Sequence, residues 1–254
     1  MYDAISNDYD RFVNWNSRLR VEMPFIERQI QQVAAPGSRV LDAACGTGMH
    51  ALALAQLGFQ VSGADLSSGM IERARLNARD AGQEIRFEAI GFGKLAQSFG
   101  RQACDVLLCL GNSLPHLTES SAQTDTLADF AACLRPGGML LMQNRNFDAV
   151  LANRIRWMEP QSFHSDDAEW VFLRFYDFDP DGLISFHMFT LHRQEHGEWN
   201  QQVTTTRLYP LKQHELVNLL TEAGFRQITC YGEMNEKPFD PATSGNLVII
   251  AIRK

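Results

Sequence analysis

The chain has 254 residues, of which 45% are hydrophobic and 21% are charged. This length suits one large α/β domain, or a core domain that carries an insertion, better than two independent domains. With 23 basic and 30 acidic residues the formal net charge is -7, which gives nucleic acid or an anionic membrane no electrostatic basis for binding.

Residues 1–9 lack the basic start and the apolar stretch of a signal peptide, and no segment approaches the roughly 18 apolar residues that a membrane span requires. The five cysteines are an odd number, lie far apart and form no C-x-x-C pair, as in a reduced cytosolic protein. We therefore expect a cytoplasmic protein.

The N-terminal region predicts a helix ahead of the first strand. Residues 9–19 bring aromatic side chains and arginines together, and apolar side chains recur at helical spacing over 16–33 until Ala-Pro-Gly at 35–37 ends the run. The sequence leaves two roles open for this region. It either docks on the sheet through an amphipathic face or folds over a bound ligand.

The segment V-L-D-A-A-C-G-T-G at 40–48 joins a strand over 39–43, the carboxylate of Asp42, and a glycine turn that enters a helix over 49–57. The glycines allow a tight bend, and the helix offers unpaired N–H groups, which suits a nucleoside-bearing ligand. Residues 46–51 also match the dinucleotide-binding pattern G-x-G-x-x-G/A, and a further alternative is a turn that connects strand and helix without binding a ligand. Asp42 favours a cationic ligand with an ammonium and a sulfonium over a pyrophosphate.

S-adenosylmethionine carries both charges, and this segment resembles motif I of the class I S-adenosylmethionine-dependent methyltransferases. The resemblance implies that Ala43, Gly46 and Gly48 approach this cofactor beside Asp42. In similar small-molecule enzymes the N-terminal segment folds over the cofactor. By that resemblance an arginine such as Arg18 meets the methionine carboxylate, and an aromatic residue such as Tyr9 lies near the methyl group.

A strand over 60–65 ends on Asp65, about 20 residues beyond the glycines, where an acidic side chain commonly accepts both ribose hydroxyls. Alternatively, Asp65 caps the helix over 67–81, which Ser67 could do equally well. By the resemblance Met70 packs on the adenine. After the third strand, 85–89, the similar enzymes carry an acidic adenine contact where this chain has Gly91, so we expect backbone groups near Phe92 and stacking to hold the base.

The fourth strand, 104–110, leads into L-G-N-S-L-P-H-L at 110–117, which lacks the D/N-P-P-Y motif of DNA and protein-glutamine methyltransferases. It resembles the L-G-N-S-x-x-H-L stretch of glycine and sarcosine N-methyltransferases. That resemblance implies that Leu110, Ser113 and His116 contact the cofactor and that Asn112 contacts the substrate. His116 is either a general base or a structural histidine.

A helix over 121–134 and a strand over 139–144 precede N-R-N-F-D at 144–148, which is similar to H-R-N-Y-D of the glycine-methylating enzymes. Their arginine holds the substrate carboxylate, and Arg145 suits this role because its planar guanidinium matches a carboxylate bidentately and keeps its charge. An ion pair with Asp148 or another acid is the alternative. R-L-Y-P at 207–210 is similar to their R-L-x-Y-Y-P run, which makes Tyr209 a candidate second donor to that carboxylate.

Residues 147–157 predict a helix, and alternating aromatic runs follow at 169–178, 183–192 and 199–209. D-P-D-G at 179–182 and H-G-E at 196–198 are typical of hairpin turns, so an antiparallel flap is expected. A helix over 212–223 and strands over 226–232 and 246–253 close the chain.

Short strands that alternate with helices predict a parallel sheet covered on both faces, with ligands beyond the carboxyl ends of its strands. With the resemblance, the expected fold is α/β: a seven-stranded, mostly parallel, Rossmann-like methyltransferase sheet with a reversed last strand and an antiparallel β flap inserted after strand five. The expected units are an N-terminal helical lid (1–36), an S-adenosylmethionine-binding core (37–150), a helix with the substrate flap (151–210), and the closing helix and strands of the core (211–254).

The expected function is an S-adenosylmethionine-dependent methyltransferase acting on a small molecule, first of all on the amino nitrogen of a small amino acid such as glycine or sarcosine. The alternatives are another N, O or C nucleophile, binding without turnover, and a dinucleotide-dependent oxidoreductase. No metal site is expected, and a homo-oligomer is expected only because the resembling glycine enzymes form oligomers. Asn112, Arg145 and Tyr209 are expected to position the substrate, and the candidate cofactor-binding residues are Tyr9, Arg18, Asp42, Ala43, Gly46, Gly48, Asp65, Met70, Phe92, Leu110, Ser113 and His116.

Overall fold

The computed structural model of this chain describes residue 6, residues 8–195 and residues 197–254. The expected lid (1–36) and the expected turn at 196–198 therefore lie partly outside the described residues. Among the helices that are described, none is both long and apolar enough to cross a membrane.

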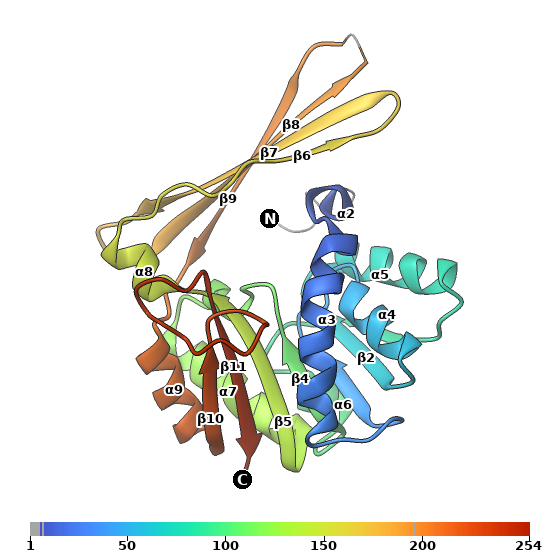
Figure 1. Ribbon diagram of the computed structural model, residues 1–254, viewed down its shortest axis with the longest axis vertical. Coiled ribbons are helices and arrows are strands. Elements are labelled where there is room, and N and C mark those ends of the chain that lie inside the picture. Colours follow the sequence, from blue (N-terminus) through green and yellow to red (C-terminus); the bar gives the residue numbers. More distant parts are fainter. Residues whose placement is uncertain (1–5, 7, 196) are drawn as a thin grey trace.

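The main sheet has seven strands in the order β10-β11-β5-β4-β1-β2-β3 (Figure 1). Parallel pairing joins five of them, and β11 is antiparallel to both of its neighbours, β5 and β10. The predicted mostly parallel sheet with a reversed last strand is thus confirmed. Its strands are β1 (Arg39–Asp42), β2 (Gln60–Asp65), β3 (Arg86–Ala89), β4 (Cys104–Cys109), β5 (Leu134–Arg145), β10 (Phe225–Tyr231) and β11 (Asn246–Arg253).

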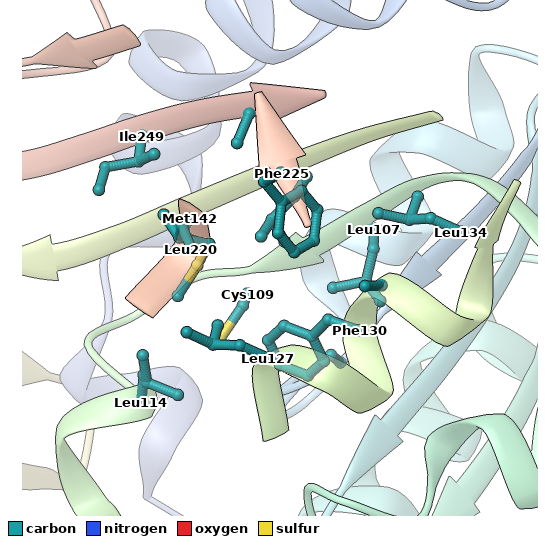
Figure 2. Close-up of a cluster of buried hydrophobic side chains, with 14 of the residues drawn as sticks. Leu107, Cys109, Leu114, Leu127, Phe130, Leu134, Met142, Leu220, Phe225 and Ile249 are labelled. Carbon is teal, nitrogen blue, oxygen red and sulfur yellow. The ribbon is translucent and has the colours of Figure 1, made fainter. Parts of the chain in front are cut away.

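Helices cover both faces of this sheet because its strands carry apolar side chains on both sides. In β4, Leu107 packs in one buried cluster, whereas Val106 and Leu108 pack in the cluster on the opposite face, as the strand alternation requires. Figure 2 shows the first cluster, in which Leu127 and Phe130 approach the strands. The first face is covered by α6 (Leu95–Phe99), α7 (Ser120–Cys133) and α9 (Gln213–Glu222), and the second by α3 (Trp15–Gln31), α4 (Met49–Gln56) and α5 (Ser68–Asp80).

The flap is a separate antiparallel sheet, as predicted, but it has four strands instead of three. The additional strand, β6, was not predicted because only Phe163 of its four residues is apolar, so it lacks the alternation that marks the others. The helix expected over 147–157 is also shorter, since α8 (Phe147–Ala152) ends before Trp157 bridges to Phe175. The strands are β6 (Gln161–His164), β7 (Ala168–Phe178), β8 (Ile184–Gln194) and β9 (Asn200–Leu208).

The flap projects beyond the main sheet, and the short helix α2 (Tyr9–Phe12) lies between the two (Figure 1). One buried cluster joins Trp170, Phe172 and Met188 of the flap to Met70, with Tyr9 and Phe12 packed against them. A second cluster packs α8 against β7, β8 and the end of β9. These two clusters hold the flap over the carboxyl ends of the parallel strands.

Candidate functional site

Two adjoining cavities open between the carboxyl ends of the parallel strands, the N-terminal segment and the flap. The first, here called the glycine-turn cavity, has a volume of about 530 Å³ and is lined by the turns after β1, β2, β3 and β4. The second, the arginine cavity, has a volume of about 510 Å³ and is lined by α3, the end of β5 and the inner face of the flap. Tyr9, Arg18, Gly111 and His116 line both cavities, so they lie side by side.

The two glycines of the turn have different tasks. Both adopt the left-handed backbone, with φ of +52° at Gly46 and +80° at Gly48. A Cβ atom at Gly48 would lie 2.9 Å from Phe87 Cζ and 3.0 Å from Ala74 Cβ, whereas one at Gly46 would meet only Tyr9 Cε1 at 3.8 Å. Gly46 therefore leaves room beside the glycine-turn cavity, and Gly48, which does not line it, allows close packing behind the turn.

Asp42 lies beneath this turn, 1% exposed, and does not itself line the cavity. Its Oδ1 atom has no hydrogen-bond partner in the described part of the chain. Burial raises the pKa of Asp42 to about 6, with Asp65 adding to the increase and with His50, the Ala44 N–H and Arg18 opposing it. A buried, incompletely paired carboxylate makes the region above it favourable for a cation, as its place in the sequence predicts.

Asp65 ends β2 at the rim of the glycine-turn cavity. Its Oδ2 accepts the Gly46 N–H at 2.9 Å and its Oδ1 accepts the Ser67 N–H at 2.9 Å. The capping role belongs to Ser67, whose Oγ accepts the Met70 N–H at 3.1 Å at the start of α5. A carboxylate offers about four acceptor positions, so these two backbone bonds do not conflict with the ribose role expected of Asp65.

The wall of the glycine-turn cavity that is formed by α5 and the turn after β3 is apolar and suits a flat ring. Met70, Ile90 and Phe92 line it, and Phe92 is fixed by an edge contact with Phe130, with ring centroids 5.4 Å apart. A Cβ at Gly91 would lie 3.0 Å from Leu66 Cδ1, so a side chain at this position would press on the residue opposite. At Gly91 the cavity is lined by backbone and not by an acidic side chain.

The loop after β4 carries residues toward both cavities. Leu110, Ser113 and His116 line the glycine-turn cavity, and the Ser113 hydroxyl donates to the Leu110 carbonyl at 2.8 Å. His116 ends the short 3-10 helix η1 (Leu114–His116), and burial lowers its pKa to about 4. The imidazole is therefore neutral at physiological pH.

Asn112, in the same loop, lines the arginine cavity in a strained left-handed backbone with φ of 65°. Its Oδ1 accepts the Arg145 N–H at 2.9 Å and its own N–H donates to the Gln143 carbonyl at 3.1 Å. These bonds fix the amide beside the end of β5. Its Nδ2 has no hydrogen-bond partner within the described residues and can donate into the cavity.

The N-terminal segment is bound to the glycine turn through Asp10, a residue that sequence analysis did not select. Its Oδ1 accepts from the Thr47 hydroxyl at 2.6 Å and from Trp15 Nε1 at 2.8 Å, and its Oδ2 accepts from Arg73 Nε at 3.1 Å. These bonds hold α2, and with it Tyr9, at the boundary of the two cavities. The ligand-covering role is thereby favoured over simple docking.

Arg18 reaches the same boundary from α3. It pairs with Glu22 at 3.0 Å and donates to Gln143 at 3.4 Å, while Glu22 also binds His50 at 2.7 Å. Although burial alone would raise it, the pKa of Glu22 is lowered by the hydrogen bond from His50 and by Arg18. The triad Glu22–His50–Arg18 was not predicted because its members lie on two helices and bear no motif.

The arginine cavity brings together polar side chains without partners. No hydrogen bond or ion pair of the Arg145 guanidinium occurs among the described residues, and Asp148, its suggested partner, instead accepts the Gln213 N–H at 2.9 Å. The alternative ion pair of Arg145 with Asp148 or another acid is therefore not found among the described residues. Asn144, 1% exposed, also lines this cavity, and both polar atoms of its side chain are buried with no hydrogen-bond partner in the described ranges.

Two further residues of the arginine cavity come from β7 and were not predicted. Arg174 and Tyr176 lie on the inner face of the flap, the same face of β7 as Trp170 and Phe172, because side chains two residues apart in a strand point to the same side. An arginine in this aromatic series is the signal that sequence analysis could have used.

Tyr209 is the expected substrate residue that lines neither cavity. Its N–H donates to the Pro115 carbonyl at 2.8 Å and its hydroxyl to Glu215 at 3.4 Å, while its ring packs against the core of the main sheet. The remaining expected residues line a cavity, apart from Asp42 and Gly48 behind the turn. Within the described chain, no group of three or more His, Cys, Asp or Glu side chains could hold a metal ion.

Comparison with known proteins provides evidence on the family of this chain that is independent of the geometry of the site. The profile of the methyltransferase domain family matches residues 40–138. The chain is 30% identical over 228 residues to the glycine/sarcosine N-methyltransferase of Aphanothece halophytica, covering 90% of this chain and 80% of that protein, and 30% identical over 233 residues to that of Halorhodospira halochloris, covering 91% and 81%. An S-adenosylmethionine-dependent methyltransferase from Clostridium acetobutylicum has a similar fold, with a TM-score of 0.80 at 16% identity over 99% of this chain and 98% of that one.

Proposed function

This chain belongs to the class I S-adenosylmethionine-dependent methyltransferases, in the group of the glycine/sarcosine N-methyltransferases, and on that premise we propose that it methylates the amino nitrogen of a small amino acid. Its enzymatic class, its cofactor and a small-molecule acceptor follow from the family. The dinucleotide-dependent oxidoreductase is thereby excluded. The proposal concerns the acceptor and the residues that hold it.

The observation that carries the proposal is the guanidinium of Arg145, which has no hydrogen-bond or ion-pair partner among the residues that the structure describes and lies in a cavity that adjoins the glycine-turn cavity. A guanidinium without an acid is an open site for a carboxylate, which it binds through two parallel hydrogen bonds. Asn112 Nδ2 and the buried amide of Asn144 add donors nearby. We infer that these three side chains anchor the carboxylate end of the acceptor.

The glycine-turn cavity has the features that S-adenosylmethionine requires. Asp65 accepts the ribose hydroxyls, the apolar wall at Met70 and Phe92 packs on the base, and the field of Asp42 favours the cationic end. Arg18, at the boundary, meets the methionine carboxylate. When bound, the cofactor supplies a methyl group on a sulfonium, and the amine lone pair forms the N–C bond as the C–S bond breaks.

The main task of the protein in such a displacement is positioning, which can contribute about 7–11 kcal/mol to lowering a barrier. Neither His116, whose pKa is about 4, nor Glu22, engaged by His50 and Arg18, suits a general base. The positive charge of Arg145 lowers the pKa of a nearby ammonium, which helps the amine lose its proton to solvent before attack. Tyr9, at the boundary of the cavities, orients the amine toward the methyl group.

The test measures S-adenosylhomocysteine release with glycine, sarcosine and other small amines in the presence of S-adenosylmethionine. We expect turnover with amino acids and none with the same amines lacking a carboxylate. Arg145→Lys removes the bidentate geometry and should raise the KM for the amino acid roughly ten- to hundredfold while cofactor affinity stays near its original value. The matched control is Arg20→Lys on the exposed side of α3. If Arg145→Lys and Arg20→Lys give the same KM, Arg145 is not the anchor.

A further inference from the structure

We infer that the natural acceptor carries a second anionic group, which Arg174 of the flap binds while Arg145 holds the α-carboxylate. This inference rests on the proposed function and adds a substrate class to it: an acidic amino acid in place of glycine. The observations that carry it are the position of Arg174, its lack of an acidic partner, and the size and charge of the arginine cavity.

Arg174 lies on the inner face of β7 and lines the same cavity as Arg145. Its Nε atom is buried and has no hydrogen-bond partner within the described residues, and its Nη2 atom makes only a long bond of 3.5 Å to the Glu159 carbonyl. The guanidinium also stacks over Phe12, 4.8 Å from the ring centroid. It is thus held in place by a ring and a carbonyl, and no carboxylate of the described part of the chain forms an ion pair with it.

The two guanidinium groups are close enough to influence each other. Burial lowers the pKa of Arg174 and the charge of Arg145 lowers it further, while Tyr176 lies within electrostatic range of both. Among the residues that line the arginine cavity, the single carboxylate is Glu22, and it is already bound to Arg18 and His50. Two like charges that share a cavity without a counter-ion repel each other, and a ligand with two negative charges relieves this repulsion.

The volume agrees with this assignment. At about 510 Å³ the arginine cavity lies in the range of roughly 300–1,000 Å³ that pockets for larger small molecules occupy. Glycine would engage Arg145 and leave the flap side of the cavity empty. A side chain that ends in a carboxylate or a phosphate extends from the α-carbon toward β7 and reaches the second guanidinium.

The experiment compares acceptors of matched size that differ in charge: aspartate with asparagine, glutamate with glutamine, and O-phosphoserine with serine. Because a charge-assisted hydrogen bond contributes roughly ten- to hundredfold in binding, the anionic member of at least one pair should have a kcat/KM at least about tenfold higher. The carboxylate pairs and the phosphate pair show which group the site takes.

Variants of Arg174 then assign the preference. Arg174→Gln should bring the ratio of kcat/KM between the anionic and neutral members toward one, and Arg174→Lys should retain part of it. The control is Arg193→Gln, an arginine on the outer face of the same flap, which pairs with Glu169 at 2.7 Å. A ratio that Arg174→Gln leaves unchanged overturns the assignment.

The failure of this inference differs from that of the proposed function. Turnover of glycine or sarcosine with equal kcat/KM in all three pairs would overturn the second anionic group and leave the amino-acid acceptor standing. Absence of turnover with every amino acid tested, in a protein that a thermal shift shows to bind S-adenosylhomocysteine, would overturn the proposed function itself.

Discussion

Asp42 offers the most quantitative test of how this site selects a cation. The carboxylate is 1% exposed, and burial raises its pKa from the ordinary 3.8 to about 6. Since each pKa unit corresponds to about 1.36 kcal/mol, the ionised Asp42 costs the ligand-free folded state about 3 kcal/mol at pH 8. Asp42→Asn removes the charge while it keeps the shape of the side chain and an oxygen for the Ala44 N–H.

The sign of the change in stability with pH follows from proton binding. Because the folded state holds the Asp42 proton more tightly than the unfolded state, this carboxylate makes the protein less stable as the pH rises from about 4 through 6. Asp42→Asn has no such dependence. The difference in free energy of unfolding, variant minus original protein, should therefore grow by about 1.5 kcal/mol between pH 5 and pH 8.

Denaturant unfolding of both proteins at several pH values measures this difference, and other titrating groups cancel in the comparison. A parallel titration with S-adenosylmethionine and S-adenosylhomocysteine, which lacks the sulfonium charge, measures the function of the carboxylate. Asp42→Asn should narrow the preference for the charged ligand. A stability difference that is constant from pH 5 to pH 8, with an unchanged ligand preference, would refute the electrostatic role of Asp42.

Three further predictions test the surroundings of the site. Gly48→Ala, whose Cβ would lie 2.9 Å from Phe87, should lower the free energy of unfolding by roughly 1–3 kcal/mol, as measured by denaturant unfolding. Gly46→Ala should instead weaken S-adenosylhomocysteine binding more than it lowers stability. If Gly46→Ala proved the more destabilising and Gly48→Ala the weaker in binding, the different tasks assigned to the two glycines would be wrong. Asp10→Asn weakens the bonds to Thr47 and Trp15 and should raise the Kd for S-adenosylhomocysteine about tenfold, which calorimetry can detect; an equal Kd would show that α2 needs no such fastening. Since His116 has a pKa of about 4, His116→Gln should lower the rate without shifting the acid limb of the pH–rate profile above pH 5; a shifted limb would make His116 a base.

The parallel part of the main sheet could be predicted from the sequence because short strand patterns alternate with helical patterns from β1 to β5, whereas the reversed last strand followed from the resemblance. The same regularity located Asp42, Asp65, Asn112 and Arg145, since parallel strands all end at one edge of the sheet. β6 could not be predicted because its residues are mostly polar and exposed, and its pairing with β7 comes from the neighbouring strand. Nothing in the residues of β6 themselves indicates that they pair with β7.

The rest of the site depends on contacts between distant segments. Asp10 and Arg73 are 63 residues apart in the sequence, and Glu22 and His50 are 28 apart, so no local spacing pattern predicts either contact. Tyr209 shows the reverse: the resemblance predicts that it donates to the substrate carboxylate, yet its hydroxyl donates to Glu215 and its ring packs against the core of the main sheet. Short motifs identify which residues approach the site but do not fix the direction of their side chains.

The two cavities are built from different parts of the chain, and this has a consequence for specificity. The glycine-turn cavity is formed mainly by turns between strands of the main sheet, whose positions the sheet fixes. The arginine cavity takes Arg174 and Tyr176 from the flap, which contacts the core through side-chain clusters and not through the main sheet. A change at Arg174 or Tyr176, which do not line the glycine-turn cavity, can therefore alter the acceptor while the cofactor site keeps its geometry. Because Arg174 and Tyr176 line the arginine cavity and not the glycine-turn cavity, acceptor preference in this group should vary with β7 more than with the strand-end motifs.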